Sequence, residues 1–174
     1  MSTYDFWRAV IAGFFATYVM TVAAAWQHAI GIHPHDPAAF MAQSLDPLGS
    51  GRGWAWGSFY HYMNGLALAL VYARWIHGRL SFHPLVLANL YGLGLVVVAM
   101  GILAPLLAPE QVGFFALKTD HALNFTLGSI LAHAAYGTTL GLFYLPEQRR
   151  AAAVGVEEEK EERARVVSKL RERA

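Results

Sequence analysis

Residues 84–109, PLVLANLYGLGLVVVAMGILAPLLAP, contain no charged residue and no histidine. At the 1.5 Å rise per residue of an α-helix, a run of this length crosses the roughly 30 Å hydrocarbon core of a bilayer. A surface helix of a soluble protein carries a polar face, which this run lacks. The run therefore predicts a membrane-spanning helix, and it decides how the rest of the chain is interpreted.

Three more segments have the length and composition of membrane spans. Residues 9–26 carry no charge, whereas 53–73 and 122–146 each carry one histidine, His61 and His133. The alternating pattern of a membrane β-barrel is absent. The sequence predicts an all-α polytopic membrane protein, in which residues 1–146 form a four-helix transmembrane domain with spans at about 9–26, 53–73, 84–109 and 122–146.

The composition excludes several classes of function. Of the 174 residues, 56% are hydrophobic and 14% are charged, against roughly a quarter charged in soluble domains. The absence of cysteine excludes disulfides, thiolate nucleophiles and Cys-ligated clusters. No nucleophile elbow, phosphate-binding glycine loop or zinc-protease motif is present. We expect no catalytic activity and, because acidic residues balance the basic ones of the tail, no nucleic-acid binding.

The positions of arginine and lysine predict the orientation. Positive residues concentrate on the cytoplasmic side of inner-membrane proteins. They are more numerous at the predicted end that carries both termini than at the opposite end: Arg8, Arg74, Arg79, Arg149 and Arg150 against Arg52 and Lys118. We therefore expect a protein of the bacterial inner membrane with both termini in the cytoplasm.

The two ends of the chain carry further expectations. Residues 147–174 hold 8 of the 13 Lys and Arg residues, and Glu159 and Arg163 stand four positions apart, as in a solvated helix. We expect a charged cytoplasmic helical tail there. The alanines at 23–25 are similar to a signal-peptide cleavage site, but the apolar stretch before them is longer than usual, which favours a retained span.

An internal repeat relates the second and fourth predicted spans. Residues 61–72, HYMNGLALALVY, align without gaps with residues 133–144, HAAYGTTLGLFY, at an offset of 72 positions. The shared skeleton is H-x3-G-x6-Y. Because two spans intervene, both segments cross in the same direction, which predicts two helical hairpins related by an axis along the membrane normal.

Small and aromatic residues of the repeat suggest how the helices pack. Gly65, Gly137 and Gly141 lack side chains and are expected to let neighbouring helices approach. Tyr72 and Tyr144 are expected at the cytoplasmic interface, with the ring in lipid and the hydroxyl in water. His77, in the following loop, is expected to contact lipid headgroups.

The matched histidines have competing interpretations, because an ionisable side chain at membrane depth usually faces the bundle interior or a polar cavity. In a structural interpretation, each imidazole is neutral and bonds a polar neighbour such as Asn64, Asn89, Thr138 or Tyr136. In a functional one, His61 and His133 face each other and bind a shared cofactor, most naturally haem b for electron transfer. Another metal or a proton relay is a third interpretation.

The first extracytoplasmic loop contains candidate metal ligands. His33, His35 and Asp36 lie close together in it and offer nitrogen and oxygen donors that suit zinc or copper. None of the standard zinc spacings occurs, so ordinary loop polarity is the favoured interpretation of these residues and metal binding the alternative.

Two segments of the chain resemble a known group of proteins. Residues 58–75, SFYHYMNGLALALVYARW, and 127–144, LGSILAHAAYGTTLGLFY, resemble the small bacterial inner-membrane proteins of the YagU-like type, which carry a similar H-x3-G-x6-Y signature in short helical hairpins. The resemblance implies a location and an architecture but no reaction.

Together these features predict an integral membrane accessory or stabilising subunit of a larger membrane assembly, without catalytic chemistry of its own. Its partners would be the lipid bilayer and another membrane protein or a second copy of the chain. Small residues along the first span, Ala12, Ala16 and Ala24, are expected to let such a partner helix approach. The alternatives are a haem electron carrier using His61 and His133, and extracytoplasmic metal binding through the first loop.

Overall fold

The protein is described by a computed structural model, which covers residues 5–32, 36, 38–40, 42, 53–80, 82–107, 112–144, 163 and 165. The chain divides into two units, one of them Asp5–Tyr144 and the other made of Met1–Tyr4 with Leu145–Ala174. In the second unit, Arg163 and Arg165 are helical and exposed. The remainder of the predicted tail helix lies outside the described residues.

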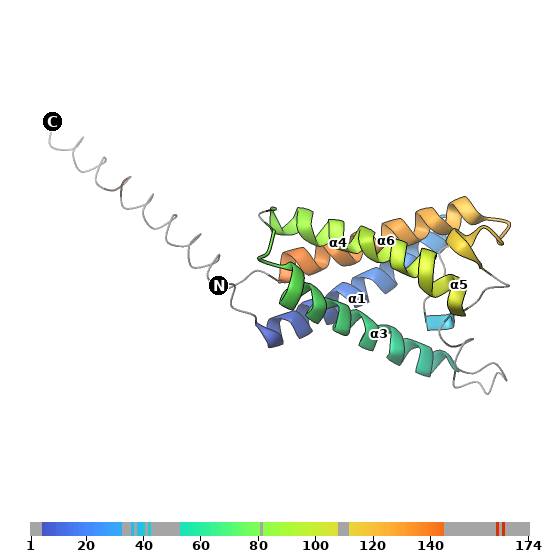
Figure 1. Ribbon diagram of the computed structural model, residues 1–174, viewed down its shortest axis with the longest axis horizontal. Coiled ribbons are helices and arrows are strands. Elements are labelled where there is room, and N and C mark those ends of the chain that lie inside the picture. Colours follow the sequence, from blue (N-terminus) through green and yellow to red (C-terminus); the bar gives the residue numbers. More distant parts are fainter. Residues whose placement is uncertain are drawn as a thin grey trace. The chain divides into compact units, whose positions relative to one another are not determined.

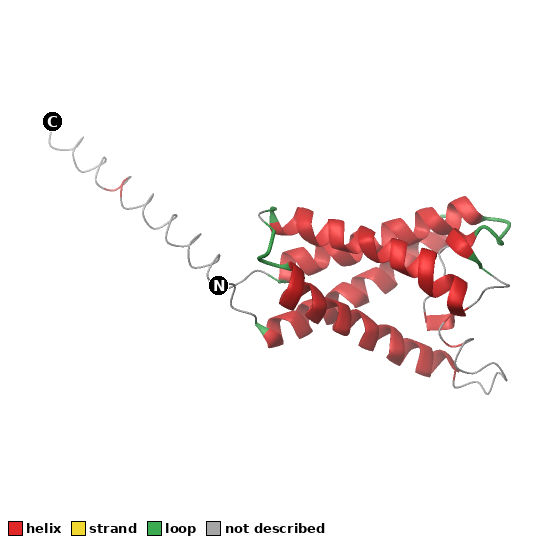
Figure 2. Ribbon diagram, in the orientation of Figure 1, coloured by secondary structure: helices red, strands yellow, loops and turns green. Residues whose placement is uncertain are grey.

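The described residues form helices joined by turns, without a β-strand (Figure 2), which confirms the predicted all-α class. The helices are α1 (Phe6–Ala29), α3 (Gly53–Val71) with its π-helical extension η1 (Tyr72–Ile76), α4 (Pro84–Val98), the π-helical η2 (Ala99–Leu103), α5 (Ala104–Leu107), the short 3₁₀ helix η3 (Phe114–Ala116) and α6 (Ala122–Phe143).

Local sequence signals explain where these helices begin and change. Asp5 caps α1, because its carboxylate accepts a hydrogen bond of 3.0 Å from the Arg8 amide. Pro84 occupies the first turn of α4, where its missing N–H costs nothing. The π-helical η2 ends two residues before Pro105, whose ring and missing N–H disturb the regular α-helical ladder of the preceding turn.

Four long helices alternate in direction to form the bundle of the Asp5–Tyr144 unit (Figure 1). Helix α1 packs against both α3 and α6, and α6 packs in turn against α4. The Asp5 amide lies 3.4 Å from the Tyr144 hydroxyl. The beginning of the first helix and the end of the last one therefore meet at the same end of the bundle.

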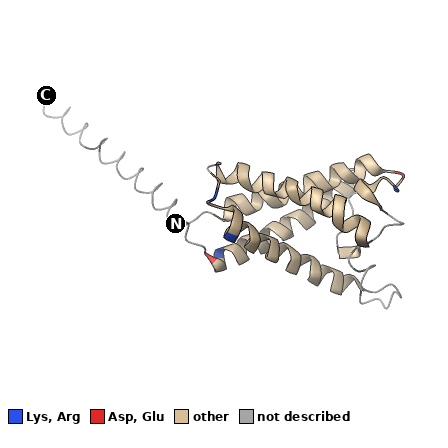
Figure 3. Ribbon diagram, viewed as in Figure 1, with Lys and Arg blue, Asp and Glu red and all other residues tan. Residues whose placement is uncertain are grey.

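Two of the helices are long and apolar enough to cross a membrane by length and composition, Phe6–Ala29 and Pro84–Leu106. Helices α3 and α6 are less apolar because polar residues such as Asn64 and Ser129 interrupt them. Charged residues of the described bundle lie near its ends (Figure 3). This composition suggests a membrane location.

Small residues bring the helices into close contact. A Cβ atom at Gly65 would collide with the Thr17 side chain of α1, and one at Gly137 would lie 2.5 Å from the Ala88 carbonyl oxygen of α4. Gly141 approaches Ala88 in the same seam, where a Cβ would lie 3.0 Å from the Ala88 Cβ. Glycine and alanine thus form the closest contacts between helices, while larger side chains such as Tyr136 and Leu140 fill the rest of the buried core.

The expectation for Tyr72, Tyr144 and His77 is wrong. Both tyrosines have 0% exposure and His77 has 5%, so none of them contacts lipid headgroups. The Tyr144 ring packs edge-on against Tyr72 and His77, with centroids 6.2 and 5.1 Å away. Tyr72 and His77 stand at the two ends of the π-helical η1, and the His77 Nδ1 lies 3.3 Å from the Tyr72 hydroxyl.

Candidate binding cavity

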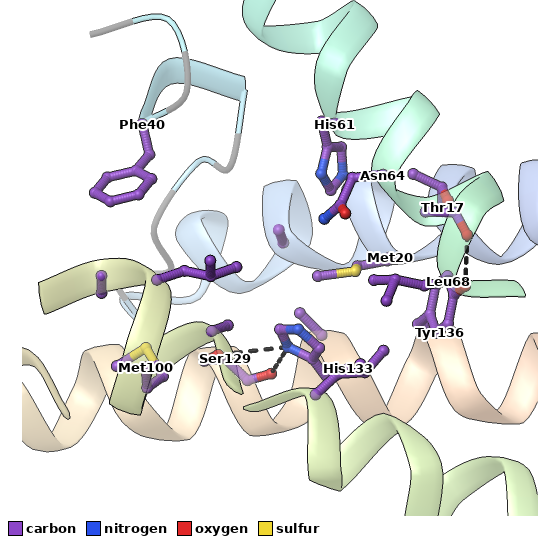
Figure 4. A pocket seen from close by; sticks show the side chains of 18 of the residues that line it. Thr17, Met20, Phe40, His61, Asn64, Leu68, Met100, Ser129, His133 and Tyr136 are labelled. Carbon is purple, nitrogen blue, oxygen red and sulfur yellow. Dashed lines mark hydrogen bonds between the residues drawn. The ribbon is translucent and has the colours of Figure 1, made fainter. Parts of the chain in front are cut away.

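The bundle contains a cavity of about 140 Å³ between α3 and the helix that runs from α4 to α5, with α1 and α6 as its floor (Figure 4). Most of its lining is apolar, and no described lining residue is charged. The polar side chains that line it are those of Thr17, His61, Asn64, Ser129, His133 and Tyr136.

The cavity opens at the seam between α3 and α4. Asn64 on α3 and Leu103 on the facing helix both line it and are also exposed on the outer surface of the bundle. One turn of α3 after Asn64, a hydrogen bond crosses the seam: the Tyr91 hydroxyl of α4 donates to the Leu68 carbonyl over 2.9 Å. A small molecule could therefore enter from the side of the bundle rather than from its ends.

His61 projects from α3 into the cavity and is 7% exposed. Its Nε2 lies 3.3 Å from the Thr21 hydroxyl oxygen, and that hydroxyl donates its one proton to the Thr17 carbonyl over 2.9 Å. The ring nitrogen must therefore be the donor toward Thr21. This arrangement places the proton of a neutral His61 on Nε2 and leaves a lone pair on Nδ1.

His133 projects from α6 toward the same space and has the opposite tautomer. Its Nδ1 lies 2.8 Å from the Ser129 carbonyl oxygen, which only accepts, so Nδ1 carries the proton. The Ser129 hydroxyl is 3.4 Å from the same nitrogen. Nε2 of a neutral His133 consequently keeps its lone pair.

The structure brings the two predicted histidines to one cavity from opposite walls. Figure 4 shows His61 above and His133 below, with the sulfur of Met20 between them. Both rings line this cavity. One largely apolar cavity therefore holds two unprotonated ring nitrogens, His61 Nδ1 and His133 Nε2.

The expectation that Asn89, Thr138 or Tyr136 bonds the two histidines is wrong. Asn89 and Thr138 bond each other, with the Thr138 hydroxyl 3.2 Å from Asn89 Oδ1. The Tyr136 hydroxyl donates to the Gly65 carbonyl over 2.7 Å. The partners that sequence reasoning missed are Thr21 and Ser129, of which Ser129 stands one helical turn before His133 and was detectable by that spacing.

Of the three residues of the predicted loop site, the structure describes only Asp36. His33 and His35 lie outside the described residues. The Asp36 carboxylate accepts the amides of Ala38 and Ala39 at 2.9 and 3.1 Å, which is a turn-forming contact. Within the described part of the chain, no group of three or more His, Cys, Asp or Glu residues could hold a metal ion.

Haem does not fit the cavity with the helices where they are. Pockets for drug-sized ligands measure roughly 300–1,000 Å³, and haem belongs to that range, whereas this cavity measures about 140 Å³. No Lys or Arg stands among its described lining residues to pair with the haem propionates. We therefore derive no electron-transfer step from the pair of histidines.

No protein-family model matches the chain, and no curated protein or solved structure is significantly similar to it. The resemblance of residues 58–75 and 127–144 to YagU-like proteins stays a prediction.

Proposed function

We propose that this protein is a four-span integral membrane protein that binds a small molecule in the cavity between α3 and α4. The observation that carries the proposal is the cavity itself, a largely apolar space onto which His61 and His133 each turn a free lone pair. An apolar pocket with a few convergent polar groups is the usual form of a ligand site. The proposal is for binding, without catalysis.

The distribution of side chains supports four membrane spans. All four long helices bear large apolar side chains on their outer faces, while small residues form the closest contacts between the helices. In water such a surface would drive aggregation, whereas lipid tails accommodate it at no cost. Examples on the four helices in turn are Phe14, Phe15 and Val22, then Phe59 and Met63, then Leu90 and Val97, then Leu127 and Leu131.

Matching contacts support the proposed pair of helical hairpins. Gly65 packs on Thr17 in the first hairpin, and the positions 72 residues later, Gly137 and Asn89, pack on each other in the second. The repeat is not perfect, because α1 packs extensively on α6 while α3 and α4 meet little. The cavity occupies this open seam.

The charges support an inner-membrane orientation with the termini in the cytoplasm. Arg8, Arg74 and Arg79 belong to the end where Asp5 meets Tyr144, since Arg8 contacts Asp5 and His77 packs on Tyr144. Lys118 precedes α6 at the opposite end, and Figure 3 shows charged residues near both ends. An excess of arginine on one side is typical of the cytoplasmic side.

The accessory-subunit hypothesis remains a prediction, but the small residues of α1 no longer support it. The small residues expected to receive a partner helix, such as Ala12 and Ala16, are fully buried within this bundle. These residues pack within the bundle, where α1 contacts α3 and α6, so they are not available to a helix of another protein. Large outward side chains suit lipid as well as a partner.

Single-cysteine labelling tests the membrane arrangement, and the chain offers a cysteine-free background. Leu80→Cys and Leu117→Cys place a thiol at exposed positions near opposite ends. In sealed inverted membrane vesicles, an impermeant maleimide should label Leu80→Cys alone, and in right-side-out vesicles Leu117→Cys alone. Labelling of both from one side would contradict the four-span proposal.

The binding function is tested with benzene as an apolar probe, because an engineered dry cavity of similar size binds it. Benzene should raise the melting temperature of the purified protein in detergent. Ala99→Leu, which fills the cavity, should remove the effect, whereas Ala25→Leu on the outer face should not. If neither benzene nor a polar relative such as phenol binds the wild type, the binding proposal fails.

A further inference from the structure

We infer that the ligand of this cavity is a small, uncharged aromatic molecule with one hydrogen-bond donor, of the phenol or indole type, which enters from the bilayer between α3 and α4. This inference rests on the proposed binding function and gives the site a chemical class. Size, charge and hydrogen bonding each restrict that class independently.

The size of the cavity restricts the ligand to one or two small rings. Its volume is about 140 Å³, close to the roughly 150 Å³ engineered cavity that takes up benzene. A sugar, a nucleotide or a folded acyl chain needs more space. Water alone would fill the site poorly, since most of the lining offers it no partner.

The lining disfavours an anionic ligand. None of the described lining residues carries a formal charge, and the cavity opens between two helices whose outer faces are apolar. An anion brought there would lose its hydration without gaining a counter-charge, and the Asp36 carboxylate, whose charge acts on His61, would repel it. Benzoate should therefore bind far more weakly than a neutral molecule of the same shape.

The two histidines require the ligand to be a donor. The Thr21 contact uses Nε2–H of His61 and the Ser129 contact uses Nδ1–H of His133, so the remaining ring nitrogens can only accept. A ligand without a donor would expel water and leave both acceptors unpaired. A hydroxyl or an indole N–H satisfies one of them, and the Asn64 amide at the mouth can donate to the oxygen of a phenol.

The apolar walls favour an aromatic body over an aliphatic one. Phe40 and Phe125 line the cavity together with the thioethers of Met20 and Met100. Aromatic rings attract one another edge-on, and methionine sulfur makes favourable contacts with ring edges. Figure 4 shows the Met20 sulfur between the two histidines and the Phe40 ring on a more distant wall.

The decisive experiment compares phenol with toluene, which has the same shape but no donor. Binding to the purified protein in lipid nanodiscs is measured by calorimetry, with concentrations referred to the lipid phase. Phenol should bind about tenfold or more tightly than toluene, as expected when one buried acceptor is satisfied by one ligand and left unpaired by the other. Benzoate should not bind.

Variants identify the acceptor. His133→Leu and His61→Leu, singly and together, should reduce the preference for phenol, with toluene binding retained. His83→Gln, a change of an exposed histidine outside the cavity, is the matched control and should change nothing. If a histidine variant does not fold, the wild-type comparison of phenol with toluene still decides the inference.

The other outcomes separate the inference from the proposed function. Equal binding of phenol and toluene, both blocked by Ala99→Leu, would overturn the donor requirement and leave the binding function standing. Failure of both ligands would overturn both proposals. Tight binding of copper, zinc or haem that depends on His61 and His133, without binding of phenol, would replace the aromatic ligand by a metal.

Discussion

The Tyr136 hydroxyl of α6 donates a 2.7 Å hydrogen bond to the main-chain carbonyl of Gly65 in α3. The two helices are also linked through α1, because Gly65 packs against the Thr17 side chain. The bond therefore joins α3 and α6 beside the cavity, which both residues line. It also satisfies the hydroxyl of a buried tyrosine, which would otherwise have no partner.

Tyr136→Phe should lower the stability of the bundle by about 1 kcal/mol, the typical net value of one hydrogen bond. The loss is limited because the Gly65 carbonyl keeps its helical partner and the ring still fills its place. Unfolding by denaturing detergent, followed by circular dichroism, measures the change. Tyr18→Phe, which alters an exposed tyrosine of α1, is the control and should leave the unfolding midpoint unchanged.

Gly65→Ala should destabilise the bundle by about 1–3 kcal/mol, because a methyl group there collides with Thr17. Thr17→Ala removes the side-chain atoms that the new methyl group meets, so it should recover part of the lost stability. A double-mutant cycle measures the coupling between the two positions. A simple sum of the two single effects would show that the contact does not limit the approach of α3.

Two other glycines provide a contrast to that pair. Gly137→Ala meets the Ala88 carbonyl and the Asn89 Cα, which are main-chain atoms, so no side-chain truncation should rescue it. Gly94 has nothing within 4 Å of a built Cβ. Gly94→Ala should therefore be neutral or stabilise α4 by up to about 1 kcal/mol through helix propensity.

Much of the architecture could be predicted from the sequence because it depends on local composition. The apolar runs located α1 and α4 within a few residues, and the H-x3-G-x6-Y repeat identified His61 and His133 as a pair that reaches one cavity. Helical spacing alone was sufficient for these conclusions, since positions four residues apart share a face.

The hydrogen bonds of the site could not be predicted in the same way. The Thr21–His61 contact and the Tyr91–Leu68 contact join different helices, and they depend on the rotation and depth of each helix. Tyr72 begins a π-helical turn that no composition rule locates, and Tyr144 is buried against Tyr72 and His77 from another helix. The membrane-interface rule therefore misplaced both tyrosines.

Nitrogen NMR of ¹⁵N-labelled histidine should show opposite neutral tautomers in the two buried rings. We expect His61 to carry its proton on Nε2, because the Thr21 hydroxyl facing it already donates to the Thr17 carbonyl. We expect His133 to carry its proton on Nδ1, because the Ser129 carbonyl facing it can only accept. Thr21→Val removes the acceptor of the His61 proton and should shift the His61 signals, with little effect on those of His133. The same tautomer in both rings would contradict the geometry from which the donor requirement of the ligand follows.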